Sequence, residues 1–405
     1  MSSIVTYSLG NLDTQCEISG LQFGLVSPEE ARRLSVVECD ESSLYVKGVP
    51  MPRSALDHRM GTVDRRMTCG TCGHNIQRCP GHWGRIELPL PVLHVAFVET
   101  IRKILNCVCY SCSRIRVAAD QLPPLGGSNV TLRKQRLGAI YSSCRHRKQC
   151  AHCSSPCPVV LRRKHSFVSL EAEWDHVDPA CFSEEERAHL VDRPLDAELV
   201  LEILAAIPDE DLWQLGLNPS TSHPKNMVLR VLLVPPPAVR PSVMVSEGSR
   251  ARGQDDLTMR LVEIIKRCAA LRGALKGGDG GGRGPETCDL WEKLAQDVSV
   301  YIHNTPRGRV ATQRSGVPTK CLFSRLKGKQ GRFRSNLMGK RVNFSGRSVI
   351  SPDPLLDVDE VGVPVNMALL LTQQEVVAGH NAAALTERVR RGAGRLDGAE
   401  TVICP

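Results

Sequence analysis

The chain has 405 residues, of which 41% are hydrophobic, 23% are charged and only 4% are aromatic, and its formal net charge is +9. This length allows two or three domains, and the composition excludes an intrinsically disordered tail. No apolar run approaches the roughly 20 residues that span a bilayer, and the first residues lack the basic flank and apolar core of a signal peptide. We therefore expect a protein of the nucleus or cytoplasm (or of a virion or viral factory, if the chain is viral) that is neither secreted nor in a membrane and keeps its thiols reduced.

The first predicted element is a short helix near the N-terminus. Ser27 can cap it, Pro28 suits its first position, and Glu30 completes a capping box. Residues 40–68 contain several glycines and prolines and are predicted to be irregular. The apolar spacing from Val92 to Leu105 then predicts a helix inside a cysteine-rich region.

The second half of the chain alternates helices with breaks. A helical region is predicted from about Ser183 to Gly216, and a strand over Val228–Val234, which three prolines stop. Helices are also predicted over Asp255–Leu271 and Trp291–His303. Between them, Gly273–Pro285 contains seven glycines and is predicted to be a flexible loop. The pattern indicates an α+β chain of several modules with mixed helices and short strands.

Cysteines concentrate in one part of the chain, because ten of the 17 lie between Cys69 and Cys157. The first group has the spacing Cys-x-x-Cys-x6-Cys-x-x-His, and such turns direct sulfur and imidazole ligands at one cation. All four tetrahedral positions are filled, so this spacing predicts a structural zinc site rather than buried free cysteines. The predicted ligands are Cys69, Cys72, Cys79 and His82.

A second cysteine group is less regular. Two Cys-x-x-Cys pairs, separated by 37 residues, can together supply four thiolates to a second structural zinc ion. A redox use of these pairs would require a βαβ context that the sequence does not indicate. The predicted ligands are Cys109, Cys112, Cys150 and Cys153, while Cys107, Cys144, Cys157 or His152 could replace one of them.

The positive charge is also localised. From Val298 to Pro352 there are 12 Lys/Arg and no Asp or Glu, whereas the rest of the chain has 40 basic and 43 acidic residues. A solvated charged loop normally mixes both signs, so this stretch indicates a specific anionic partner. Its densest part, Arg325–Arg347, includes four glycines that allow backbone N–H groups to approach phosphates.

These motifs, in this order, closely resemble the N-terminal part of the largest subunit of multisubunit DNA-directed RNA polymerase, of the eukaryotic, archaeal and large-DNA-virus type. The resemblance rests on long segments of the chain, which are Phe23–Glu30, Arg59–Arg65, Cys79–Ile86, Pro91–His94, Val234–Ser242, Asp255–Thr258, Arg325–Arg347, Val349–Ser351 and Asp353–Pro354. It implies a mobile clamp that holds both zinc ions and ends in a basic switch segment.

The resemblance also implies a division of the chain and a set of nucleic-acid contacts. The segments are the clamp core (1–68), the zinc-binding clamp head (69–160), a helical clamp segment (161–240), a region like the lid and rudder (241–324), and the switch segment with the start of the active-site domain (325–405). The switch would grip template DNA and the RNA–DNA hybrid. Its expected contacts are Arg325, Lys327, Lys329, Arg332, Arg341 and Arg347.

Catalysis in this family uses two Mg²⁺ ions held by three aspartates at alternate positions, a motif that the sequence lacks. We therefore expect no catalytic residue and no Mg²⁺ in this chain. The complete enzyme would need a separate chain, or a missing C-terminal part, for those aspartates, together with the second-largest subunit and other polymerase subunits. The alternative is a standalone zinc-containing regulator that binds nucleic acid and derives from a polymerase subunit.

Overall fold

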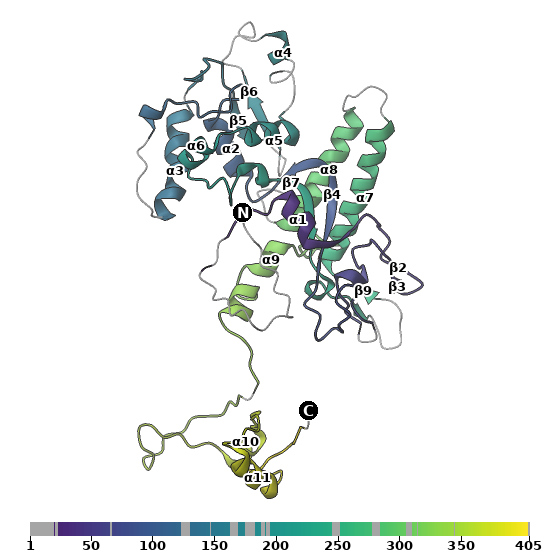
Figure 1. The fold of residues 1–405 in the computed structure, drawn as a ribbon, viewed down its shortest axis with the longest axis vertical. Helices are drawn as coiled ribbons and strands as arrows, with labels where there is room; N and C mark the ends of the chain where they lie inside the picture. The colour runs from purple at the N-terminus through teal and green to yellow at the C-terminus, as the bar shows by residue number, and fades with distance from the viewer. Residues whose placement is uncertain are drawn as a thin grey trace. The chain divides into compact units, whose positions relative to one another are not determined.

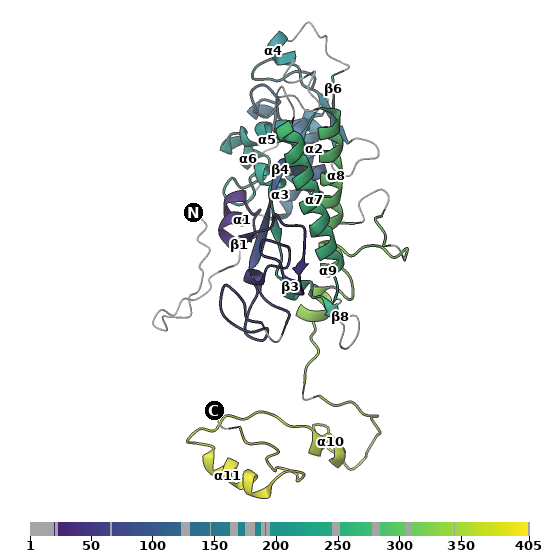
Figure 2. The same ribbon diagram turned by 90° about the vertical axis from the view of Figure 1, so that its right-hand side faces the viewer.

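The structure is a computed structural model, and it describes residues 20, 23–64, 67–122, 130–145, 147–162, 169–174, 183–187, 191, 195–244, 252–277, 284–304, 310–313, 315–343 and 345–403. The chain forms two compact units, residues 1–326 and 327–405. Helices and strands mix in the first unit (Figures 1 and 2), in agreement with the predicted α+β class. The finer division into five segments stays a prediction.

The first helix, α1 (Pro28–Leu34), begins where the sequence predicts it. The Glu30 backbone N–H donates to Ser27 Oγ at 3.1 Å, and the Ser27 N–H donates to the Glu30 carboxylate at 3.0 Å, so the capping box is confirmed. The helix ends at Leu34 because the β-branched pair that follows continues as strand β1 (Ser35–Glu38).

A three-stranded sheet lies at the centre of the first unit, with the order β1–β4–β7. Strand β4 (Trp83–Leu93) runs parallel to β1 and antiparallel to β7 (Val228–Val234). The prediction of β7 is confirmed at both ends. Alternate residues of β4, including Ile86, Leu88 and Leu90, are buried in the main core with residues of the covering helices.

Strand β4 was not predicted, because its two prolines argue against a central strand. The structure accommodates Pro89 and Pro91 with an irregularity, since the pairing with β7 shifts between Glu87 and Val92. The predicted helix that included Val92 is therefore wrong at its start, and helix α2 covers Val98–Cys107 only. The carbonyl of Pro91 instead accepts a hydrogen bond from Trp291 Nε1 at 3.0 Å.

The predicted helical region from Ser183 to Gly216 forms several short helices. They are α4 (Glu184–Glu186), α5 (Ala197–Ala205) and α6 (Asp209–Gln214). Asp196 caps α5 by accepting from the Leu199 N–H at 2.8 Å. Helix α3 (Val130–Cys144) packs on α2, and strands β5 (Val159–Arg162) and β6 (Leu170–Glu173) pair antiparallel nearby.

Two long helices, α7 (Asp256–Gly277) and α8 (Pro285–Ile302), form an antiparallel hairpin beside the sheet (Figures 1 and 2). The predicted flexible loop over Gly273–Pro285 is wrong at both ends, because α7 continues to Gly277 and α8 begins at Pro285. Residues 278–283 of that prediction lie outside the described residues. Packing against a partner helix outweighs the cost of about 1 kcal/mol for each helical glycine.

The remaining elements of the first unit are short. They are β2 (Tyr45–Val46), β3 (Val49–Pro50), η1 (His58–Met60), η2 (Ala119–Gln121), η5 (Pro224–Met227), η6 (Pro237–Val239), β8 (Val243–Met244), β9 (Arg252–Gly253) and α9 (Leu322–Leu326). In the described chain, no helix has the length and apolar character needed to cross a membrane.

The second unit contains a π-helical turn, η7 (Phe333–Leu337), and helices α10 (Val365–Leu370) and α11 (Ala382–Arg391). From residue 332 to residue 403, every described residue is exposed or half-buried. Val349 and Ile350, for example, are 93% and 96% exposed. This unit therefore has no hydrophobic core among its described residues.

Candidate metal centres and basic segment

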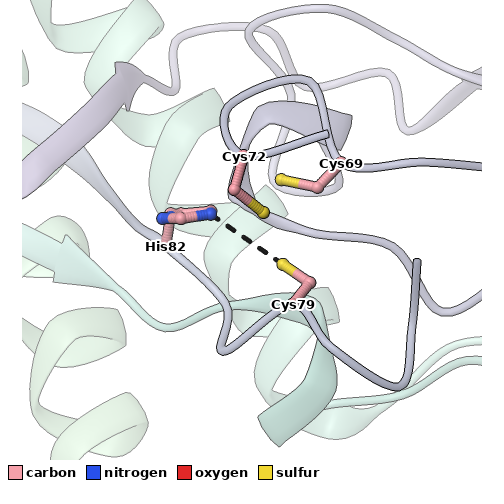
Figure 3. A group of neighbouring side chains, drawn as sticks. All are labelled: Cys69, Cys72, Cys79 and His82. Carbon is pink, nitrogen blue, oxygen red and sulfur yellow. Dashed lines mark hydrogen bonds between the residues drawn. The ribbon is translucent and has the colours of Figure 1, made fainter. Parts of the chain in front are cut away.

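The first predicted ligand set comes together just before β4. The sulfur atoms of Cys69, Cys72 and Cys79 and a ring nitrogen of His82 all lie within 4.8 Å of one another. Figure 3 shows the four side chains pointing toward a common centre, with Cys79 Sγ and His82 Nε2 3.8 Å apart. The loop after η1 supplies the three cysteines, and His82 is the last residue before the strand.

Backbone turns hold these sulfur atoms in place. The Thr71 N–H donates to Cys69 Sγ and the Gly81 N–H donates to Cys79 Sγ, each at 3.4 Å. Gly81 has a φ of +83°, and a Cβ at this position would lie 2.7 Å from the Pro236 ring. Glycine is therefore required in this turn, which seats the cluster against the proline run after β7.

The electrostatics of this cluster favour one thiolate. Burial opposes ionisation of Cys69, but N–H donors from Cys72 and Thr71 outweigh it and hold the pKa of that thiol below its usual value. Burial, and the neighbouring thiols, raise the pKa of Cys79 to about 11. A cation at the centre of the cluster would favour ionisation of Cys79.

The second predicted set also comes together. One sulfur atom from each of Cys109, Cys112, Cys150 and Cys153 lies within 4.8 Å of all the others. Cys109 Sγ lies 3.5 Å from Cys153 Sγ, and Cys112 Sγ lies 3.7 Å from Cys150 Sγ.

The two pairs of this set occupy turns of the same construction. The Ser113 N–H donates to the Cys109 carbonyl and the Ser154 N–H donates to the Cys150 carbonyl, both at 3.0 Å. Ser113 and Ser154 both have positive φ values, 55° and 59°. The second set is therefore built from two equivalent turns that face each other.

The residues that the sequence left as alternative ligands lie beside this set. The thiols of Cys107 and Cys144 hydrogen-bond to each other, and both are fully buried. His152 is exposed, although its backbone N–H donates to Cys150 Sγ at 3.4 Å. A hydrogen bond from the fully buried Cys157 thiol, together with the backbone N–H groups of Cys112 and Ser111, lowers the pKa of Cys109 to about 4.

Both sets fit the geometry of zinc. A Zn–S bond of about 2.3 Å places the sulfur atoms of a tetrahedral site about 3.8 Å apart, which agrees with the 3.5 and 3.7 Å separations here. Burial and repulsion from the Cys109 thiolate raise the pKa of Cys112, which a cation would reverse. Each set can hold a metal ion with four protein ligands, which leaves no position for a reacting water.

The predicted nucleic-acid contacts divide between the two units. Arg325 lies in α9, is partly buried and pairs with the Asp255 carboxylate, so a phosphate would have to compete with that ion pair. Arg332 donates to Asn336 Oδ1 at 3.0 Å and is exposed. The other four predicted nucleic-acid contacts are exposed residues of the second unit, namely Lys327, Lys329, Arg341 and Arg347.

Fold and clusters together define an α+β protein with two four-residue sets, each of which could hold a metal ion. Two family models cover nearly the whole chain: "RNA polymerase Rpb1, domain 1" matches residues 15–337, and "RNA polymerase Rpb1, domain 2" matches residues 339–404. The chain belongs to the RNA polymerase Rpb1 family, where it corresponds to the N-terminal part of the largest subunit, of the archaeal type.

Curated relatives carry the name "DNA-directed RNA polymerase subunit Rpo1N". The protein of Thermococcus celer is 37% identical over 399 residues, which are 96% of this chain and 42% of the relative. The Methanocaldococcus jannaschii protein is 38% identical over 402 residues, covering 96% and 28% of the two chains. The Sulfolobus acidocaldarius protein is 36% identical over 392 residues, covering 96% and 43%. The chain thus spans less than half the length of these relatives.

Proposed function

We propose that this chain serves as part of a DNA-directed RNA polymerase, a nucleotidyltransferase, inside the cell. The observation that carries this proposal is the match of two consecutive Rpb1 domains over residues 15–337 and 339–404. The chain would form the clamp and the switch segment that grips the template. The Mg²⁺-binding aspartates that extend RNA would come from polypeptide outside these 405 residues, together with the second-largest subunit and the other subunits.

The two cysteine clusters would give the clamp its rigidity through structural zinc. Each cluster lies in a segment with little regular structure, where four metal–ligand bonds replace the packing that a larger core would supply. One ion would be bound by Cys69, Cys72, Cys79 and His82, and the other by Cys109, Cys112, Cys150 and Cys153. Catalysis would not involve either ion, because both ligand sets are closed.

Zinc analysis of the purified chain tests this assignment. We expect about two zinc ions per chain by elemental analysis, one for each four-ligand set. A cobalt-substituted sample should show the absorption of tetrahedral thiolate coordination. A chain purified without chelators that contains neither zinc nor another bound metal would overturn the metal assignment.

The basic segment would contact template DNA and the RNA–DNA hybrid. The support is the absence of acidic residues from Val298 to Pro352, together with the exposure of five of the six predicted contacts. Regions like the lid (Pro235–Thr258) and rudder (Asn304–Lys320) would lie nearby. Of these, residues 245–251, 305–309 and 314 lie outside the described residues.

Substitution of Arg332 or Arg341 by Ala should weaken template binding by the assembled polymerase. Each lost phosphate contact should reduce the slope of log K against log salt by about 0.9 on duplex DNA and about 0.7 on single strands. Fluorescence anisotropy at several salt concentrations measures this slope. Arg33→Ala, an exposed arginine on α1, is the control and should leave the slope unchanged. Equal slopes for all variants would contradict the switch assignment.

Affinity purification of the tagged chain, followed by mass spectrometry, tests its assembly into a polymerase. We expect it to co-purify with a second-largest polymerase subunit and with a polypeptide that carries the catalytic aspartates. Recovery of the chain alone, in a form that still binds nucleic acid, would favour the standalone regulator instead.

A further inference from the structure

Arg116 is a buried cation between the two turns of the second cluster. Its side chain is one of the largest in the protein that are fully buried, at 1% exposure. The guanidinium donates to the carbonyls of Leu105, Val108 and Pro158 at 2.9 to 3.0 Å. Val108 precedes Cys109, and Pro158 follows Cys157, so one side chain links the segments that carry the cluster.

The backbone of the same residue makes a further link. The Arg116 N–H donates to the Cys107 carbonyl at 2.8 Å, and the Arg116 carbonyl accepts from the Ala151 N–H at 3.0 Å. Ala151 lies between the two cysteines of the second turn. Arg116 is therefore fixed to both turns at once.

No carboxylate among the described residues pairs with this guanidinium. An unpaired charge in a protein interior is costly, and carbonyl dipoles offset only part of that cost. Among the described residues, the charge of Arg116 favours ionisation of the buried Tyr110 hydroxyl and of the thiols of Cys107, Cys144 and Cys157, which lie beside the four-cysteine set. Its charge thus lies beside the thiols of the cysteine-rich region, and the nearby Asp211 carboxylate accepts from the Ile115 N–H at 2.9 Å instead.

Metal binding would supply that negative charge. Four thiolates around one Zn²⁺ leave two negative charges in excess. Two of the four ligands are buried, Cys109 at 0% and Cys150 at 3% exposure, while Cys112 is half-buried and Cys153 is exposed. The first cluster, with a neutral imidazole in place of one thiolate, would carry less excess charge around the same ion. A buried cation nearby would therefore offset more charge at the second cluster than at the first.

We propose that Arg116 is the counter-cation of the second metal centre and keeps its two turns at metal-binding distance. The inference rests on the zinc assignment above and concerns retention of the ion rather than catalysis. It assigns to Arg116 a positioning role outside the ligand set, and such outer residues change metal affinity by about 10- to 100-fold.

Zinc release to a chromogenic chelator measures this role in the full chain. Cys109→Ser and Cys69→Ser identify which kinetic phase belongs to which cluster. Arg116→Gln, which removes the charge, should accelerate release from the second cluster by about 10-fold or more. Arg116→Lys, which retains the charge, should accelerate it less. The first cluster is the internal reference, and Arg114→Gln, an exposed neighbour, is the matched control.

A double variant in which the charge of the ligand set is also reduced distinguishes two roles of Arg116. The first role is to compensate the charge of the thiolates, and the second is to supply hydrogen bonds to the backbone. Cys153 is exposed, and Cys153→His removes one thiolate, which makes the second set resemble the first. In the Cys153→His chain, Arg116→Gln should accelerate zinc release less than it does in the wild-type chain. If the Arg116→Gln single variant folds poorly, the yield of folded chain is compared instead. An undiminished effect, or equal release from the Lys and Gln variants, would overturn the proposal. Wild-type chain that contains neither zinc nor another bound metal would instead overturn the metal assignment itself.

Discussion

Cys109→Ser should remove one zinc ion from the chain and unfold the segment around the second cluster. Cys109 is fully buried, lies 3.5 Å from Cys153 Sγ and accepts a hydrogen bond from Cys157. Serine would leave a closed tetrahedral set with three thiolates, and a structural zinc site contributes on the order of 10 kcal/mol to the folding of its module. We expect one zinc ion per chain and rapid amide exchange between about residues 107 and 158.

Cys288→Ser is the matched control, because Cys288 is an exposed cysteine on α8 outside both clusters. It should retain both zinc ions and the protection of the wild-type chain. Retention of two ions by Cys109→Ser would mean that another thiol, such as Cys157, acts as the ligand. Cys157→Ser would then lose the ion, and zinc analysis of the two variants distinguishes these ligand sets.

Arg240→Met should cause the second large effect, a loss of about 3–5 kcal/mol of stability in the first unit. The fully buried Arg240 donates to the Pro235 carbonyl and to Thr258 Oγ1, each at 3.0 Å, and to the Ala55 carbonyl. It thereby joins the proline run, the first turn of α7 and the loop before η1. Methionine fills a similar volume but leaves these acceptors unpaired.

Native-state hydrogen exchange in α7 and β4 measures this loss. Arg230→Met, at an exposed position on β7, is the control and should change stability by less than about 0.5 kcal/mol. Similar protection in both variants would show that the buried hydrogen bonds of Arg240 contribute little.

Local signals in the sequence predicted several elements of the fold well. The capping box at Ser27 and the β-branched run of Val228–Val234 depend on neighbouring residues only, and both were confirmed. Strand β4 was missed because its prolines are tolerated only through a pairing irregularity that depends on β7. The extent of α7 was underestimated because α8 stabilises its glycine-containing end, a contact between distant residues.

At the metal centres, too, features that depend on neighbouring residues were predicted and features that depend on distant contacts were not. The spacing of the cysteines predicted which side chains would come together, since each Cys-x-x-Cys turn is local. The sequence gives no comparable spacing signal for Arg116. Its neighbours Ile115 and Val117 are apolar, and no adjacent residue predicts that the arginine is buried. Its position follows from hydrogen bonds to the Leu105 carbonyl of α2, to the Val108 carbonyl just after that helix, and to the carbonyl of Pro158, which is distant in the sequence.

The hairpin of α7 and α8 has a mechanical consequence, because it is tied at both ends. Near its tip, Trp291 donates to the Pro91 carbonyl of β4, and Arg272 donates to the Glu87 carbonyl. At its base, Asp255 pairs with Arg325, at the root of the basic segment. Twenty-two residues of α7 span about 33 Å as a stiff strut. A force applied to the chain at Arg325 would therefore be transmitted through the hairpin to the sheet. A hinge would then have to lie outside this hairpin.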